Sequence, residues 1–224
     1  MVDSGLSGRD VVVFGATGAL GAAVAAGFAA AGATVSGLDR AEPPAERQLP
    51  QVRYRAVNAL DDAELGALFD GQAPWAVINT IGGYAPRSPL TEFDPAELSR
   101  QVELNLVSAA LITKHALRVM QPAGQGRIVH TASRAATVTA GQGFAYSVSK
   151  LGVLHLVRMA ADEVRGTGVT VNCVVPTIID TPANRAAMPT ARYDTWPKPD
   201  QIARCYLYLA GPDAALVNGA ALPV

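Results

Sequence analysis

Short apolar runs alternate with longer stretches of mixed or small residues along almost the whole chain. The short runs are rich in Val and Ile and are bounded by Gly, Pro or polar residues, which is typical of strands buried on both faces of a sheet. They predict seven strands, at Asp10–Phe14, Thr34–Leu38, Val52–Val57, Trp75–Thr80, Gly126–Thr131, Val169–Val174 and Ala220–Val224.

The longer stretches between these runs have helical periodicity or a high content of small apolar residues. They predict helices at Ala19–Ala31, Asp61–Phe69, Pro95–Met120, Phe144–Arg165 and Pro199–Leu209. Regular alternation of strand and helix indicates an α/β fold, in which one parallel sheet is covered by helices on both faces. Because no Gly- or Ser-rich linker divides the chain, we expect one domain over residues 1–224. The proline-containing stretch 176–198 reads as a long irregular loop, here called the substrate loop.

Composition and charge narrow the choice of partner. Half of the 224 residues are hydrophobic and the formal net charge is −1. With no basic run, the chain is not expected to bind nucleic acid or a membrane, and a small-molecule partner is favoured. The amino-terminal residues lack a signal-peptide pattern, so we expect a cytoplasmic protein. Neither the two cysteines nor the three histidines have metal-binding spacing, and no metal is predicted.

A glycine-rich turn follows the first expected strand and opens the first helix. Glycines allow the backbone to turn tightly and to approach a pyrophosphate, whose charge is met by free N–H groups at the helix start. Close strand–helix packing is the alternative reason for these glycines. The residues expected to hold the pyrophosphate are Gly15, Thr17, Gly18, Ala19, Leu20 and Gly21.

The second expected strand is followed by an acidic residue, Asp39, and a basic residue, Arg40. Asp39 stands where a carboxylate can accept hydrogen bonds from both ribose hydroxyls of an adenosine, which favours NAD(H). Arg40 could instead pair with the 2′-phosphate of NADP(H). The sequence therefore favours NAD(H) over NADP(H) without excluding the latter.

Tyr146 and Lys150 are four residues apart in an expected helix, so both side chains lie on one face. A nearby ammonium lowers the pKa of a phenol and makes it a better proton donor and acceptor at neutral pH. The pair alone also occurs by chance, and its meaning depends on the residues around it.

These motifs resemble the compact branch of the short-chain dehydrogenase/reductase family over essentially the whole chain. The resemblance rests on the Gly15–Gly21 turn, on Asn79-Thr-Ile-Gly82 after the fourth strand, and on Ser133 placed before Tyr146 and Lys150. It implies a doubly wound Rossmann fold with strand order 3-2-1-4-5-6-7. It also implies an NAD(P)-dependent oxidoreductase that acts on carbonyl or alcohol groups.

The same resemblance implies roles for individual residues. Tyr146 would exchange a proton with the substrate oxygen, Ser133 would hold that oxygen, and Lys150 would bind the nicotinamide ribose and lower the pKa of Tyr146. Asn105 would hold, through its backbone, a water on the proton route from Lys150. Further cofactor contacts are expected from Asn58, Asn79, Gly82, Pro176, Ile178, Ile179 and Thr181.

Substrate contacts are expected from loops at the carboxyl edge of the sheet. The candidates are Tyr84, Arg87, Arg134, Gln142, Asn184, Met188, Tyr193 and Trp196. The stretch Asp180–Pro189 followed by Trp196 is similar to dihydropteridine reductases, so reduction of a quinonoid pterin is one alternative activity. A non-catalytic NAD(H)-binding regulator is another. From the family, we also expect a homodimer or homotetramer formed through the long middle helix and the helix of Tyr146.

Overall fold

The computed structural model describes residues 5–84, 89–138 and 143–224. Seven strands form one parallel sheet in the order β3-β2-β1-β4-β5-β6-β7, as the resemblance implied. The strands are β1 (Asp10–Phe14), β2 (Thr34–Asp39), β3 (Val52–Ala56), β4 (Ala76–Asn79), β5 (Gly126–Thr131), β6 (Val169–Val175) and β7 (Ala221–Pro223). The predicted strands are therefore confirmed, with ends that differ by one or two residues.

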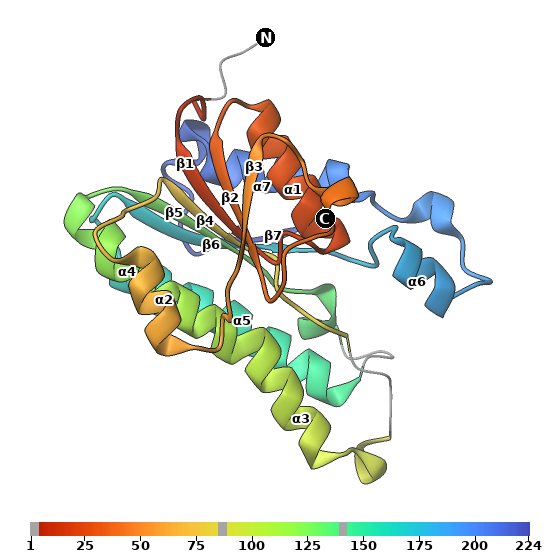
Figure 1. Cartoon of the computed structure of the whole chain (residues 1–224). Coiled ribbons are helices and arrows are strands. Elements are labelled where there is room, and N and C mark those ends of the chain that lie inside the picture. Colours follow the sequence, from red (N-terminus) through yellow and green to blue (C-terminus); the bar gives the residue numbers. More distant parts are fainter. Residues whose placement is uncertain (1–4, 85–88, 139–142) are drawn as a thin grey trace.

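Helices cover both faces of the sheet, so that the fold has three layers (Figure 1). The helices are α1 (Ala19–Ala30), α2 (Asp62–Phe69), α3 (Pro95–Val102), α4 (Ser108–Ala123), α5 (Phe144–Glu163), α6 (Pro182–Ala187) and α7 (Pro199–Ala210). One apolar core lies between the sheet and α1 and α7, and a second lies between the sheet and α2, α4 and α5. Strands β4 and β6 are buried over their whole length, as expected for strands of a parallel sheet covered on both faces.

Two helix predictions need correction. The predicted helix Pro95–Met120 is divided by a π-helical segment, Glu103–Val107, between α3 and α4. It also continues through Pro122 to Ala123, because a proline in the last turn removes only its own N–H, and the helix ends at the left-handed Gly124 (φ 65°). In the substrate loop, α6 was not predicted, although Thr181 caps it and Pro182 begins it in the usual way.

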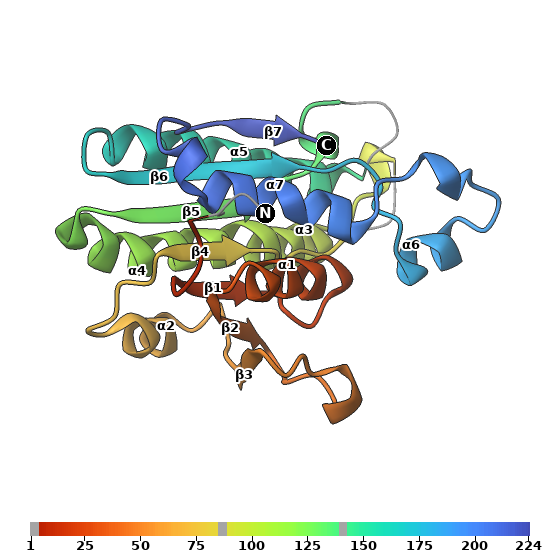
Figure 2. The same ribbon diagram turned by 90° about the horizontal axis from the view of Figure 1, so that it is seen from above.

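The strand ends place the candidate site. In Figure 2 the arrows of β4, β6 and β7 point toward the side of the molecule where α6 lies. The carboxyl ends of parallel strands meet at this edge, so the loops after β1, β2, β4, β5 and β6 gather there. Among the described residues, no helix is long and apolar enough to cross a membrane.

Candidate active site

In the glycine-rich turn between β1 and α1, neighbouring atoms lie so close that two of the glycines leave no space for a side chain. Gly15 has a φ of +78°, and a Cβ added to Gly21 would lie 2.0 Å from the Gly15 carbonyl oxygen. At Gly18 the nearest atom to an added Cβ is 3.4 Å away, so this residue does not need to be glycine for packing. Close strand–helix packing, the alternative reason for these glycines, thus explains Gly15 and Gly21 but not Gly18.

Helix α1 begins at this turn with its first amide groups available. Gly18 precedes the helix and provides no side-chain cap. Within the described part of the chain, the N–H groups of Ala19, Leu20 and Gly21 have no hydrogen-bond acceptor. Free N–H groups and the positive end of the helix dipole form a site for an anion. The turn therefore fits the pyrophosphate of a dinucleotide.

Asp39, at the end of β2, fixes the position of the turn. Its Oδ2 accepts hydrogen bonds from the Thr17 hydroxyl (2.6 Å) and the Thr17 N–H (3.2 Å), and its Oδ1 accepts one from the Arg40 N–H (2.8 Å). The Arg40 side chain is exposed. Asn58, after β3, is also exposed, and its Oδ1 accepts a hydrogen bond from the Leu60 N–H (3.1 Å).

The segment after β4 is held from two sides. The Oδ1 of buried Asn79 accepts a hydrogen bond from the Ile81 N–H (3.0 Å). Gly83 donates its N–H to Asn105 Oδ1 (3.2 Å), and Asn105 Nδ2 donates to the Gly83 carbonyl (3.3 Å). A Cβ added to Gly82, between them, would lie 2.8 Å from Lys150 Nζ. These contacts bring the segment, here called the β4 turn (residues 81–83), against the Lys150 ammonium.

Asn105 occupies the π-helical segment that divides the long middle helix. Its Nδ2 also donates to Gln101 Oε1 (2.9 Å) and to Ser149 Oγ (3.0 Å), which links the segment to α5. At the end of this segment the Ser108 hydroxyl donates a hydrogen bond to the Leu104 carbonyl (2.6 Å). Single π turns inside helices are frequent at functional sites. What the structure adds to the prediction is a role for the Asn105 side chain, which clamps the β4 turn.

Ser133 and Tyr146 meet at the carboxyl end of β5. Burial raises the pKa of Tyr146, and a hydrogen bond between the two side chains opposes that rise. The ring of Tyr84 lies edge-on to that of Tyr146, with centroids 5.4 Å apart. Tyr146 is therefore a protonated phenol at neutral pH.

Lys150 is almost fully buried, and its Nζ donates a hydrogen bond to the Thr131 carbonyl (2.9 Å). Burial lowers its pKa to about 8. Lys150 is not among the groups that shift the pKa of Tyr146. In this structure burial of the phenol dominates its pKa, and the lowering of that pKa by Lys150 stays a prediction.

The substrate loop is braced by contacts among its own residues. Asp180 and Arg185 form a two-point ion pair (2.6 and 2.8 Å), and the Arg185 guanidinium lies 4.9 Å from the Tyr193 ring centroid. The Tyr193 ring in turn packs edge-on against Trp196, with centroids 5.1 Å apart. The loop therefore presents an aromatic cluster, with its Arg185 charge already neutralised.

The remaining predicted contacts on these loops are placed as follows. The Pro176 carbonyl accepts a hydrogen bond from the Arg134 N–H (3.0 Å), which joins the loops after β5 and β6. Ile179 packs against the core of α1 and α7, whereas Ile178 is 41% exposed, so Ile178 is the better placed for a ligand. The Thr181 hydroxyl accepts the Asn184 N–H (3.1 Å), and Met188 is half-buried. Arg87 and Gln142 lie outside the described residues.

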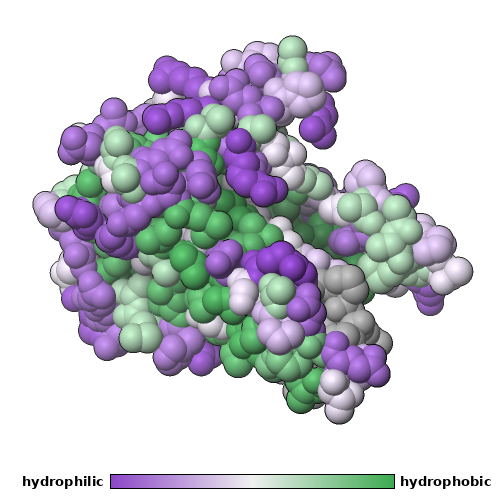
Figure 3. Space-filling model, turned by 60° about the horizontal axis from the view of Figure 1, so that its bottom comes forward, coloured by the Kyte–Doolittle hydropathy of each residue, from purple (hydrophilic) through white to green (hydrophobic). Residues whose placement is uncertain are grey.

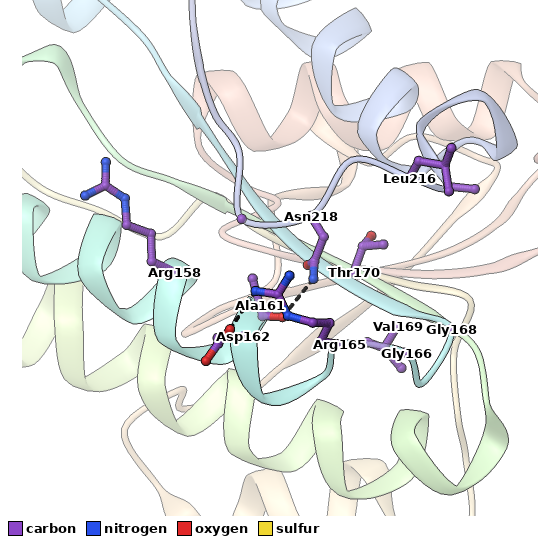
Figure 4. A pocket seen from close by; sticks show the side chains of 12 residues that line it. Arg158, Ala161, Asp162, Arg165, Gly166, Gly168, Val169, Thr170, Leu216 and Asn218 are labelled. Atoms are coloured by element: carbon purple, nitrogen blue, oxygen red, sulfur yellow. Dashed lines mark hydrogen bonds and ion pairs between the residues drawn. The ribbon is translucent and has the colours of Figure 1, made fainter.

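Two further features bear on the choice of site. A cavity of about 730 Å³ lies at the amino end of β6, away from the glycine-rich turn (Figure 4). Arg165 there is paired with Asp162 (2.6 Å) and Arg158 points away from the other lining side chains, so the cavity has no convergent polar groups. Within the described ranges, no group of three or more His, Cys, Asp or Glu side chains could hold a metal ion.

The sequence interpretation did not identify the residues that support the site from behind. Thr80 donates its hydroxyl to the Phe14 carbonyl (2.7 Å), and Thr131 donates its hydroxyl to the Asn79 carbonyl (2.7 Å). The same Thr131 hydroxyl contacts the hydroxyl of buried Tyr206 (2.7 Å). Their only signal in the sequence is a hydroxyl residue at a strand end, which is too common to be read as a site.

Comparisons with known proteins agree with this arrangement. A family model described as enoyl-(acyl carrier protein) reductase matches residues 15–224. The cis-4-hydroxycyclohexanecarboxylate dehydrogenase of Sinomonas cyclohexanicum is 34% identical, over 96% of this chain and 94% of its own. The D-threitol dehydrogenase of Mycolicibacterium smegmatis is 31% identical, over 99% and 93%.

Solved structures give the same result. A short-chain type dehydrogenase/reductase from Mycobacterium ulcerans superposes with a TM-score of 0.88 at 26% identity, over 97% of this chain and 88% of its own. A protein from Beutenbergia cavernae, assigned as an NAD(P)-dependent gluconate 5-dehydrogenase and holding NADP at low occupancy, has a TM-score of 0.90 at 26% identity, over 99% and 96%. This chain therefore belongs to the short-chain dehydrogenase/reductase family, and it is an NAD(P)-dependent oxidoreductase of alcohol or carbonyl groups.

Proposed function

We propose that the enzyme interconverts a secondary alcohol and its ketone, with Tyr146 as the general acid and base. The observation that carries this proposal is the position of Ser133 beside the Tyr146 phenol, at the sheet edge where buried Lys150 and the β4 turn also lie. A nicotinamide cofactor, when bound, would accept or supply the hydride. The glycine-rich turn would hold its pyrophosphate through the free N–H groups of α1.

In the direction of reduction, Tyr146 would give a proton to the oxygen that gains negative charge. Burial raises the pKa of Tyr146, so the phenol carries its proton at neutral pH before the transfer. Ser133 would donate a second hydrogen bond to the same oxygen. Lys150, beside the β4 turn, would offer its ammonium to the nicotinamide ribose. A regulator that binds the cofactor without turnover would not need a proton donor and a second hydrogen-bond donor for a substrate oxygen.

We propose NAD(H) as the preferred cofactor. Asp39 lies at the end of β2 beside the glycine-rich turn and carries a negative charge where a 2′-phosphate would approach. Arg40 is exposed next to it and is the residue that could compensate that charge. One structural neighbour holds NADP, and separate titration with NADH and NADPH measures the preference of this chain.

The substrate class follows from the relatives and from the substrate loop. The similar proteins described above are named for the oxidation of a hydroxycyclohexane carboxylate and of threitol, and a galactitol 2-dehydrogenase is 31% identical over 98% of this chain. Tyr84, Tyr193 and Trp196 provide flat surfaces on which an alicyclic ring could pack. We propose a small cyclic or polyhydroxylated secondary alcohol. None of these relatives is named as a pterin reductase.

We also propose that two copies pack through α5 and the neighbouring π-helical segment. A hydrophobic band crosses the face formed by the helices below the sheet (Figure 3). Val107, Val148, Leu151 and Met159 are each between 37% and 61% exposed, and the last three lie on α5. Apolar patches of this kind mark protein interfaces. Light scattering should show a dimer or tetramer, and Leu151→Lys should shift the mass toward the monomer.

The proposed activity can be tested by two measurements on the purified protein. NADH and NADPH are first added separately, and the melting temperature is recorded, because a ligand that binds the folded state raises it. Reduction of NAD⁺ is then followed with cyclic and acyclic secondary alcohols. A larger shift with NADH and turnover of at least one alcohol class are expected. A protein that binds the cofactor but turns over no secondary alcohol or ketone would contradict the proposal.

A further inference from the structure

A buried polar chain crosses the core behind the β4 turn. It runs from Thr113 on α4, through His130 on β5, to Asn79 at the end of β4. His130 is 0% exposed, and the other two residues are at most 4% exposed. A fully buried chain of this length is costly unless every polar group in it has a hydrogen-bond partner.

The backbone fixes the direction of each bond. The Ile81 N–H can only donate, so the Asn79 atom that faces it is the amide oxygen (3.0 Å). The Asn79 NH₂ then faces His130 Nδ1 (3.2 Å), which must accept. In a neutral imidazole the proton is therefore on Nε2, which donates to the Thr113 oxygen (2.8 Å). The Thr113 hydroxyl in turn donates to the Ala109 carbonyl (2.7 Å).

We infer that His130, as the neutral Nε2–H tautomer, is a positioning residue for the cofactor side of the active site. It orients the Asn79 amide, and this amide holds Ile81 at the start of the β4 turn. Asn105 holds Gly83 at the other end of the turn, and Gly82 between them lies against the Lys150 ammonium. His130 thus sets the distance between the turn and the group that would meet the nicotinamide ribose. The inference rests on the proposed cofactor site.

The electrostatics agree with this tautomer. A protonated imidazole would place an N–H at Nδ1 against the Asn79 NH₂, donor against donor. Burial and the nearby Lys150 charge lower the pKa of His130 to about 3, so the ring is neutral in the physiological range. Scattered histidines such as this one are easily taken as purely structural, and the connection to the β4 turn is visible only in three dimensions.

The test compares NADH affinity in variants that keep or lose the donor and acceptor pattern. His130→Leu should weaken NADH binding by about tenfold, since one buried amide loses its acceptor. His130→Gln can accept through its oxygen and donate through its nitrogen, so it should stay within about threefold of wild type. Thr113→Val, which preserves shape, should fall between the two.

His115→Leu is the matched control. His115 is also buried on α4, but its Nε2 contacts Asp62 on α2 (2.7 Å), away from the β4 turn. This variant should lose thermal stability without a change in NADH affinity. Nitrogen NMR of the wild type at pH 7 should show His130 protonated on Nε2 and not on Nδ1.

Several outcomes would overturn the inference. A proton on Nδ1, equal losses of affinity in His130→Leu and His115→Leu, or a His130→Gln variant no better than His130→Leu would each do so. Wild-type protein that binds neither NADH nor NADPH would refute the proposed function itself. Cofactor binding that is the same in wild type and in both His130→Leu and Thr113→Val would refute only the role of His130.

Discussion

At the glycine-rich turn the shape of the site comes from the backbone, whereas in the substrate loop it comes from side chains that pair with one another. An added Cβ at Gly21 would lie 2.0 Å from a backbone oxygen, which leaves no alternative residue. In the substrate loop, Asp180, Arg185 and Tyr193 hold one another on the surface, and each contact could be lost without a gap in the core. The comparison teaches that the nucleotide side is fixed before any ligand arrives, while the substrate side can be changed at little cost in stability.

Gly21→Ala gives the largest effect and tests the nucleotide side of the site, where the backbone fixes the shape of the glycine-rich turn. The methyl group would force the backbone of the turn apart, and overpacking of this kind costs about 1–3 kcal/mol. The melting temperature should fall by several degrees, and NADH should no longer raise it. Gly18→Ala is the control, because its nearest neighbour is 3.4 Å away. If both variants had the same melting temperature and the same response to NADH, the conformation of the turn would not depend on close packing at Gly21.

Asp39→Asn tests how the nucleotide side of the site selects between NADH and NADPH. The amide keeps an oxygen for the Thr17 hydroxyl but removes the negative charge. We expect the ratio of NADPH to NADH affinity to rise by about tenfold, because one repulsive charge near the 2′-phosphate is lost. Fluorescence titration with both cofactors measures this ratio. An unchanged ratio of the two affinities would indicate that Arg40, and not Asp39, determines the cofactor preference.

The pH dependence of NADH binding tests the role of Lys150. Because its pKa is lowered to about 8, the ammonium is present at pH 7 and is lost above pH 8. NADH affinity should be constant below pH 8 and fall by up to about tenfold per pH unit above it, if the cofactor needs the charged form. Lys150→Met should bind more weakly and without this dependence. The same fall in the variant would assign the titration to another group.

Asp180→Asn gives the smallest effect and tests the substrate loop. It removes the charge of Asp180, whose side chain is 8% exposed, from the pair with the half-exposed Arg185, while the amide keeps an oxygen that the guanidinium can bind. We expect an unchanged melting temperature and a change of about threefold in the KM for the alcohol, with kcat for the best substrate unaffected. A large loss of stability would mean that the substrate loop is as rigid as the glycine-rich turn.

The sequence predicted those parts of the molecule in which local patterns decide the structure. β-Branched runs gave the strands of the buried sheet, and the spacing of Gly15, Gly18 and Gly21 gave the turn before α1. The π-helical segment around Asn105 was not predicted, because a shift of one residue in hydrogen-bond register leaves the hydrophobic pattern almost unchanged. The burial that raises the pKa of Tyr146 was not predicted either, since burial depends on the packed fold and not on the spacing to Lys150.

The link between His130 and the active site is the clearest example of what a single sequence does not contain. Its partners Asn79 and Thr113 come from β4 and α4 and stand 51 and 17 residues before it in the chain. Only the sheet order places β4 beside β5 and brings the three side chains together. Long-range polar contacts of this kind have no periodic signal.

The most direct test of the account is the turnover of Tyr146→Phe compared with wild type, with NADH binding measured on both. The phenyl ring keeps the packing against Tyr84 and removes only the proton donor. We expect kcat for alcohol oxidation and ketone reduction to fall by about 10²–10⁴-fold, with NADH affinity within a few-fold of wild type. Turnover that survives in Tyr146→Phe would contradict the central claim that Tyr146 exchanges the proton.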